Sequence, residues 1–224
     1  DLGTLPNGEP IPEIRNGPQW FIEGYPLGGY WDFPVSYEDA NGDGILTPSE
    51  VTVGDEEVFL GPSIPTRDFT ANTSVTFFNT VRVNALLDYR GGHKLENATE
   101  DFRCQFGICE GLNDPNASLD HQARALVSAV LPASQATAAG YIEDASFWRL
   151  REVGATVFLP EAWVGNIGAD RASITLTGRN LAVWTDYSGV DPEVNQFGQD
   201  NFNIRDFLTQ PPVRTFVARV NISF

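Results

Sequence analysis

The stretch from residue 213 to residue 224, V-R-T-F-V-A-R-V-N-I-S-F, alternates apolar and polar side chains up to its last residue. One face of the expected strand carries Phe216, Ala218, Val220, Ile222 and Phe224, and the other carries Thr215, Arg219, Asn221 and Ser223, with Val217 as the exception. A period of two residues is typical of a β-strand whose two faces meet different surroundings. An aromatic residue at the very end is unusual for a soluble domain, whose last residues fray. The segment therefore predicts a two-faced strand.

Further strands are expected upstream. Asn72–Phe78 and Val81–Arg90 flank a short turn and predict a hairpin, while Phe147–Leu159 and Ala172–Val183 show strand periodicity over longer stretches. Another strand is expected within Gln19–Trp31. Together these segments predict an all-β, antiparallel fold.

The connections between the expected strands alternate in length. Residues 78–80 and 160–171 are short connections, whereas roughly 32–70, 91–146 and 184–212 are long. Antiparallel pairing then places every long connection at the same end of the sheet, the asymmetry of outer-membrane barrels with tight periplasmic turns and long extracellular loops. The pattern predicts a segment of a transmembrane β-barrel. Within one long loop, helical spacing over Leu119–Ala133 predicts a short structural helix.

Composition excludes several other classes. The 224 residues carry a net charge of −16, which argues against nucleic acid and against docking on an anionic membrane surface. There is no run of about 18 apolar residues, so a transmembrane helix is excluded. The chain starts at Asp1 without a signal peptide and contains no methionine, which indicates either a processed N-terminus or a fragment of a longer protein, and we expect a fragment.

Several motifs occur in one order along the chain. They are Glu23–Gly28 (E-G-Y-P-L-G), residues 39–44, Leu60-Gly61-Pro62, Glu143–Arg151 (E-D-A-S-F-W-R-L-R), Gly178–Leu181 (G-R-N-L), Tyr187–Glu193 (Y-S-G-V-D-P-E) and the closing strand to Phe224. This ordered set covers nearly the whole chain. It resembles SusC/RagA-type TonB-dependent outer-membrane receptors.

The resemblance implies a 22-stranded barrel around an N-terminal plug. It also implies uptake of oligosaccharides or peptides, driven by TonB, under a SusD-like surface lipoprotein. Residues 1–224 would supply about the last six strands, without the plug and the TonB box, and so cannot transport alone. Phe224 would be the last contact of the signal that the barrel-assembly machinery reads. The other partner would be outer-membrane lipid, and no enzyme activity is expected.

A twelve-residue motif, D-A-N-G-D-G-I-L-T-P-S-E at residues 39–50, fits the EF-hand-like calcium loop in every fixed position. The expected oxygen ligands to Ca²⁺ are Asp39, Asn41, Asp43, the Ile45 carbonyl, Thr47 and Glu50. Pure oxygen ligation favours calcium over zinc or copper. A metal-free turn is the alternative, because Asn, Asp and Gly also favour turns. Pro48 makes flanking EF-hand helices unexpected, so we expect the ion to stiffen an extracellular loop.

Cys104 and Cys109 lie in one long loop of a chain expected to cross the periplasm, and most simply form a disulfide. Free thiols or a metal site are the alternatives. Asp191-Pro-Glu193 is either a turn or a ligand for metal or substrate. His93 and His121 belong to no nucleophile motif.

The aromatic residues near strand ends are expected in interfacial girdles or in the core, with sugar stacking as the alternative. They are Trp20, Tyr30, Trp31, Trp148, Trp163, Trp184 and Tyr187. A rival class for the chain as a whole is a secreted, calcium-stabilised β-sandwich that binds glycans. A glycoside hydrolase domain lacks any supporting motif.

Overall fold

The computed structural model describes residues 3–6, 8–9, 12–198, 200 and 203–224. The chain divides into two compact units. The strand unit comprises residues 67–91, 147–185 and 212–224, and the loop unit comprises residues 1–66, 92–146 and 186–211. Each unit is described by itself below. Among the described helices, none combines the length and apolar character needed to cross a bilayer.

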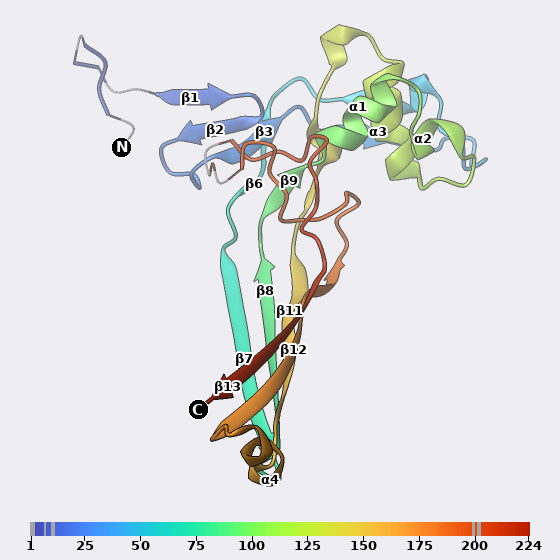
Figure 1. The fold of residues 1–224 in the computed structure, drawn as a ribbon. Coiled ribbons are helices and arrows are strands. Elements are labelled where there is room, and N and C mark those ends of the chain that lie inside the picture. Colours follow the sequence, from blue (N-terminus) through green and yellow to red (C-terminus); the bar gives the residue numbers. More distant parts are fainter. Residues whose placement is uncertain (1–2, 7, 10–11, 199, 201–202) are drawn as a thin grey trace. The chain divides into compact units, whose positions relative to one another are not determined.

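The strand unit is one antiparallel sheet of five strands in the order β13-β12-β11-β8-β7 (Figure 1). The strands are β7 (Arg67–Phe77), β8 (Val81–Gly91), β11 (Phe147–Phe158), β12 (Arg171–Thr185) and β13 (Thr215–Ser223). Each coincides with a predicted strand to within a few residues, apart from β7, which begins five residues before the predicted start. The antiparallel prediction is therefore confirmed.

The two hairpin connections of this sheet are short. Phe78 and Asn79 both have positive φ, 50° and 54°, the backbone combination that matches the twist of a tight hairpin. The turn is closed by the Thr80 amide, which donates to the Phe77 carbonyl at 2.9 Å. The connection between β11 and β12 contains α4 (Glu161–Val164) and η4 (Gly165–Ile167).

The register gives the sheet one apolar and one polar face, because directly paired residues share a face and neighbours along a strand alternate. The apolar face carries Phe69, Val75 and Phe77 of β7, Val81, Val83 and Leu87 of β8, Trp148, Leu150, Val153 and Val157 of β11, Ile174, Leu176 and Trp184 of β12, and Phe216, Val220 and Ile222 of β13. The polar face carries Thr70, Asn72 and Ser74 of β7, Arg82, Asn84 and Asp88 of β8, Glu152 and Thr156 of β11, Thr175 and Arg179 of β12, and Arg219 and Asn221 of β13. The edge strands β7 and β13 are exposed along their whole length.

Hydrogen bonds link the polar face across its strands. Glu152 accepts from the Asn84 side chain at 3.1 Å and from Arg179 at 2.9 Å. Arg151 donates to Asp88 at 2.7 Å. The polar side chains of this face are thus partnered with each other rather than with an apolar core.

A β-bulge interrupts β11 at Arg151. Leu150 pairs with Leu87 and Glu152 pairs with Leu86, so the backbone register with β8 shifts by one residue at Arg151. On the β12 side, Asn180 lies at the same level and adopts a left-handed φ of 52°. A bulge adds one residue and changes the parity of the alternation. As a result Trp148 and Leu150 stay on the apolar face.

The strand ends that lead to long connections, Arg67, Gly91, Phe147 and Thr185, all lie at one end of the sheet, as predicted. The segment expected to add a strand at Gln19–Trp31 behaves differently. It forms two four-residue strands, β2 (Gln19–Ile22) and β3 (Gly29–Asp32), in a separate sheet of the loop unit. Four residues are too few to span a bilayer, which takes about 9–11.

The described residues of the loop unit form three small sheets and short helices. The sheets pair β1 (Glu13–Asn16), β2, β3 and β6 (Val58–Gly61), then β4 (Val35–Tyr37) with β5 (Val51–Val53), and β9 (Lys94–Glu96) with β10 (Ile142–Asp144). The helices are α1 (Ala98–Gln105), α2 (Glu110–Asn113) and α3 (Leu119–Ala129), with 3₁₀ turns η1 (Pro48–Glu50), η2 (Ala133–Gln135) and η3 (Ala139–Tyr141).

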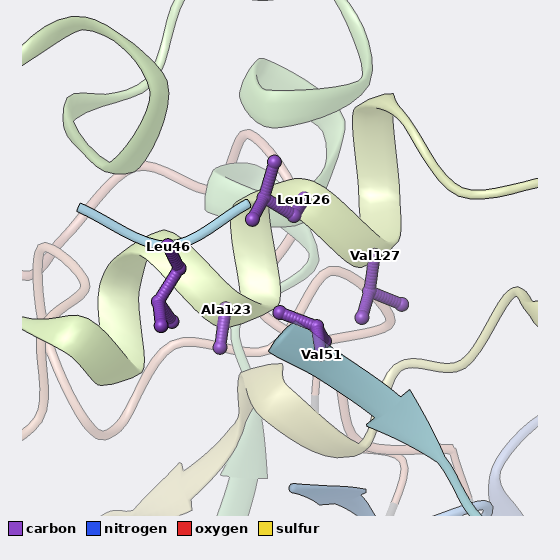
Figure 2. Packing of buried hydrophobic residues seen from close by; sticks show 5 residues of the cluster. All are labelled: Leu46, Val51, Ala123, Leu126 and Val127. Atoms are coloured by element: carbon purple, nitrogen blue, oxygen red, sulfur yellow. The ribbon is translucent and has the colours of Figure 1, made fainter. Parts of the chain in front are cut away.

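Helix α3 is the predicted loop helix, and it forms the main apolar contact of this unit. Its residues Ala123, Leu126 and Val127 are buried against Leu46 and Val51 (Figure 2). Ser118 caps its N-terminus by accepting from the His121 amide at 3.3 Å. The core therefore ties the 39–50 segment to a helix more than 70 residues later in the chain.

Candidate calcium loop and polar network

The predicted calcium loop, residues 39–50, runs between β4 and β5. The Asp39 carboxylate accepts from the Gly42 amide at 2.8 Å and from the Gly44 amide at 3.0 Å. The Asp43 carboxylate accepts from the Ile45 amide at 2.8 Å, and the side-chain oxygen Oδ1 of Asn41 accepts from the Asp43 amide at 2.9 Å. Gly44 has a φ of 80°, which a side chain would strain. These bonds hold the oxygens of Asp39, Asn41 and Asp43 against backbone amides of the same loop.

Glu50, at the twelfth position, reaches back to the start of the loop. Its carboxylate accepts from the Ala40 amide at 3.1 Å, and from the amide and hydroxyl of Thr47, each at 2.8 Å. These bonds, with the Thr47 amide foremost, hold the pKa of Glu50 below its usual value. The carboxylate is therefore ionised at neutral pH. It lies beside Ala40, next to Asp39 at the start of the loop.

The donor set fits calcium in its chemistry. Every predicted ligand offers a hard oxygen, and no nitrogen or sulfur ligand enters the motif. The surrounding charge also suits a cation, since the loop unit has 25 acidic and 5 basic residues, whereas the strand unit has 5 and 9. The same hydrogen bonds also stabilise a metal-free turn. Calcium binding thus stays a prediction.

A buried polar network forms the centre of the loop unit. Arg205 donates from Nη2 to Glu96 Oε1 at 2.6 Å and from Nε to Glu96 Oε2 at 3.0 Å. Burial raises the pKa of Glu96 although Arg205 opposes the shift. Asp206 is 1% exposed and accepts from the Tyr187 hydroxyl at 2.9 Å and the Thr99 hydroxyl at 3.3 Å. Burial likewise raises the pKa of Asp206.

Glu143 joins three further segments to this network. Its carboxylate accepts from Arg124 at 2.8 Å, from Asn97 at 3.3 Å, and from the hydroxyl and amide of Ser188 at 2.6 Å and 2.9 Å. Arg124 is 5% exposed, so this ion pair is nearly dry. Ser188 of the 186–211 segment and Arg124 of α3 thus both bind the carboxylate of Glu143 in β10.

The other predicted site residues lie as follows. Cys104 and Cys109 form a disulfide with a Cα–Cα distance of 4.8 Å. Asp191 accepts from the Glu193 amide at 2.9 Å, which is a turn contact. Trp20, Tyr30 and Tyr187 are core residues, whereas Trp148, Trp163 and Trp184 are exposed. Phe224 is 80% exposed at the end of the chain.

The sequence analysis did not identify three features of this unit. They are the hydrogen bonds of Gln122 to the 39–50 loop, the Glu96–Arg205 ion pair and the Arg124–Glu143 ion pair. Glu143 was part of a recognised motif, but its partners are 19, 45 and 46 residues away. Such pairings depend on how loops fold over each other, and local patterns do not encode this. One local signal for the Arg124–Glu143 pair was available. Arg124 stands in the apolar run from Ala123 to Val127 of the predicted helix, where a charged side chain needs a partner.

The loop unit also holds a cavity of 460 Å³ beside the N-terminal half of α3. Val35, Tyr37 and Leu60 form an apolar wall, while His121, Asp120 and Asp186 contribute polar groups. A volume of this size suits a small ligand. The cavity combines an apolar surface with groups that accept hydrogen bonds.

Comparison with known proteins agrees with this architecture. TonB-dependent receptor P26 of Formosa agariphila is 26% identical over 203 residues, which cover 85% of this chain and 19% of the relative. TonB-dependent receptor P3 of the same organism is 36% identical over 89 residues, covering 38% of this chain and 9% of that protein. No family model matches the sequence. The chain thus spans less than a fifth of the length of these curated relatives.

Solved structures of the RagAB peptide importer have the same fold over nearly the whole chain. The closed-closed state gives a TM-score of 0.63 at 16% identity, covering 96% of this chain and 25% of the other. The open-open state gives 0.60 at 19% identity, with 96% and 24% covered. The proteins matched are named as receptors and importers, which transport rather than catalyse.

The two-faced antiparallel sheet with its long connections at one end is therefore the feature of this chain to set beside these proteins. The chain is similar to part of the proteins named TonB-dependent receptors and shares its fold with part of the RagAB importer.

Proposed function

We propose that this chain forms part of the barrel wall and the extracellular loops of an outer-membrane transporter that imports oligosaccharides or peptides. The observation that carries the proposal is the two-faced sheet of the strand unit. Nutrient import is supported by the similarity to TonB-dependent receptors and to a protein described as a peptide importer. The choice between the two substrate classes belongs to the proposal.

In this proposal the apolar face of the sheet contacts lipid and the polar face lines a water-filled lumen. The strands have 9 to 15 residues, enough for tilted membrane-spanning strands. Trp148 contacts Tyr89 and Phe69, with ring centroids 4.8 Å and 6.1 Å apart, at the end of the sheet that leads to the long loops. Such a group suits the aromatic girdle at a membrane interface. The five strands would be completed to a 22-stranded barrel by the rest of the receptor.

The partners follow from the same proposal. A SusD-like surface lipoprotein would cover the loop unit, as the AB pairing in the name of the RagAB importer suggests. TonB would act through the N-terminal part of the receptor. The barrel-assembly machinery would read the terminal strand, with Phe224 as its last contact.

An uptake experiment tests the transport proposal. Bacteria that lack the receptor gene should lose uptake of one labelled class, peptides or oligosaccharides, and regain it when the full-length gene is restored. Unchanged uptake and growth on both classes would overturn the proposal. Protease added to intact cells should cut within residues 39–50 and 105–109, and cleavage only after lysis would overturn the topology.

We also propose that residues 39–50 bind Ca²⁺ as a structural ion. Asp39, Asn41, Asp43, Thr47, Glu50 and the Ile45 carbonyl would supply its oxygens. Bound calcium would neutralise three carboxylates and stiffen this loop. It would take no part in moving the substrate.

The rival hypothesis, a secreted calcium-stabilised β-sandwich that binds glycans, requires a second sheet packed on the apolar face. Within the described residues, the exposed edge strands β7 and β13 offer no sign of such packing. Solubility separates the two: the sandwich should express as a soluble monomer, whereas the barrel segment should need detergent or its missing strands.

A further inference from the structure

The side chain of Gln122 is buried between helix α3 and the 39–50 loop. It is 4% exposed. Its Nε2 donates to the Gly44 carbonyl at 2.9 Å and to the Ala117 carbonyl at 2.8 Å, while its Oε1 accepts from the Leu46 amide at 2.8 Å. Both N–H donors of the carboxamide are thus used, together with its oxygen.

These contacts bracket Ile45. Gln122 binds the carbonyl of the residue before it and the amide of the residue after it. The Ile45 side chain is 49% exposed, so packing contributes little to holding it. The Ile45 carbonyl shares a peptide group with the Leu46 amide, and the Gly44 carbonyl belongs to the peptide group before it. The Ile45 carbonyl can change direction only if one of these two peptide groups rotates. Gln122 therefore fixes the direction in which the Ile45 carbonyl points.

The chemistry of this position calls for an amide. One side chain must donate to a carbonyl and accept from an N–H at the same time, and a glutamine does both. A glutamate at pH 7 accepts only, so it would face the Gly44 carbonyl with a negative charge. A methionine has similar length and offers neither strong group.

We propose that Gln122 is a positioning residue for calcium: it orients the Ile45 carbonyl toward the ion and couples occupancy of the loop to helix α3. This inference rests on the proposed calcium site. Residues that orient metal ligands without touching the metal change affinity by about 10–100-fold when they are replaced. The coupling follows because Gln122 lies beside Ala123, which packs on Leu46 of the same loop.

The test uses the full-length receptor, purified in detergent and freed of metal by chelation. Calcium is titrated by calorimetry, and hydrogen exchange is followed in peptides that cover residues 39–50 and 119–129. The Asp43→Ala variant sets the baseline for calcium bound elsewhere. In the unmodified receptor, calcium should slow exchange in both peptides.

Gln122→Glu and Gln122→Met should each weaken calcium binding at least 10-fold, and calcium should no longer slow exchange in residues 119–129. Gln105→Glu, which adds the same charge on an exposed position of α1, should bind like the unmodified receptor. Each variant is compared with its own calcium-free state, so a general loss of stability does not imitate the result. If one Gln122 variant fails to assemble, the other gives the reading.

The outcomes separate the two claims. If the unmodified receptor binds no more calcium than Asp43→Ala, the calcium site is refuted and the role of Gln122 with it. If it binds calcium and both Gln122 variants match it in affinity and in exchange, the calcium site stands and the positioning role is overturned.

Discussion

Arg205 grips the carboxylate of Glu96 with two hydrogen bonds across 109 residues of sequence, and the Glu96 side chain is 3% exposed. A buried carboxylate held in this way depends on its partner, because an unpaired charge in a dry environment is costly.

Arg205→Ala should lower the local free energy of opening around β9 by about 3 kcal/mol, because Glu96 would remain buried without its cation. Hydrogen exchange in residues 94–99 of the full-length receptor measures this. Arg103→Ala is the matched control, since Arg103 forms an exposed pair with Glu100 whose removal should cost less than about 1 kcal/mol. Equal effects of the two variants would contradict the prediction.

The stability of this network should fall as pH rises. Burial raises the pKa of Asp206, with Asp191 and Glu143 adding to the shift, so the folded state holds its proton more tightly than the unfolded state. That contribution is complete below the unfolded pKa, about 4, and disappears as pH rises through the folded value. Hydrogen exchange in residues 203–206, corrected for intrinsic rates, should show the decline. Asp206→Asn should flatten it, and an unaltered slope in that variant would refute the assignment.

The disulfide should stabilise the α1–α2 region by about 2 kcal/mol, the value for closing so short a loop. Both cysteines are at most 2% exposed and pack with Tyr141 and Ala125. The double variant Cys104→Ser, Cys109→Ser should therefore be cleaved faster by protease between residues 104 and 109. In the unmodified receptor, alkylation should add mass only after denaturation with reductant. Labelling without reductant would count against the bridge.

Calcium should protect residues 39–50 from protease, and Asp43→Ala should abolish the protection. The reason is that the ion would cross-link carboxylates that otherwise bond to nearby groups of the same loop. Limited proteolysis with calcium or with chelator provides the measurement. Asp55→Ala, outside the motif, is the control. The same cleavage rate of the unmodified receptor in both conditions would defeat the calcium assignment.

Neighbouring residues of β12 test the two faces of the sheet. Leu176→Arg puts a charge on the apolar face, where lipid contact should cost about 2–4 kcal/mol. Thr177→Arg puts the same charge on the polar face and should be tolerated. The fraction of receptor assembled in the outer membrane, read by heat-dependent gel mobility, should fall only for Leu176→Arg. Equal assembly of both variants would argue against lipid on this face.

The strand unit was largely predictable because its information is local. A period of two residues marks each long strand, and the sheet keeps that period over many residues, as in β13 and β12. Antiparallel pairing of neighbours then gives the order and the end at which the loops emerge. Boundaries differed by a few residues at most strand ends.

The loop unit was predictable only in part. The α3 helix and the 39–50 loop follow from short sequence patterns. The segment of β2 and β3 was expected to contain one strand, but a turn around Pro26 divides it into a hairpin. Contacts such as Gln122 with Leu46 or Arg205 with Glu96 join residues 76 and 109 positions apart. They arise from the folding of whole loops, and no local periodicity signals them.

The bulge at Arg151 changes which residues of β11 lie on the apolar face, from even-numbered to odd-numbered positions. From Trp148 to Leu150 the positions on the apolar face are even-numbered, and from Val153 to Val157 they are odd-numbered. A sequence search that assumes one uninterrupted apolar–polar alternation would match only one of the two halves of β11 at a time. Deleting residue 151 would restore a single alternation, with Trp148, Leu150, Val153 and Val157 on the same face. If Arg151 were kept but the bulge straightened, Trp148 and Leu150 would instead turn to the polar face.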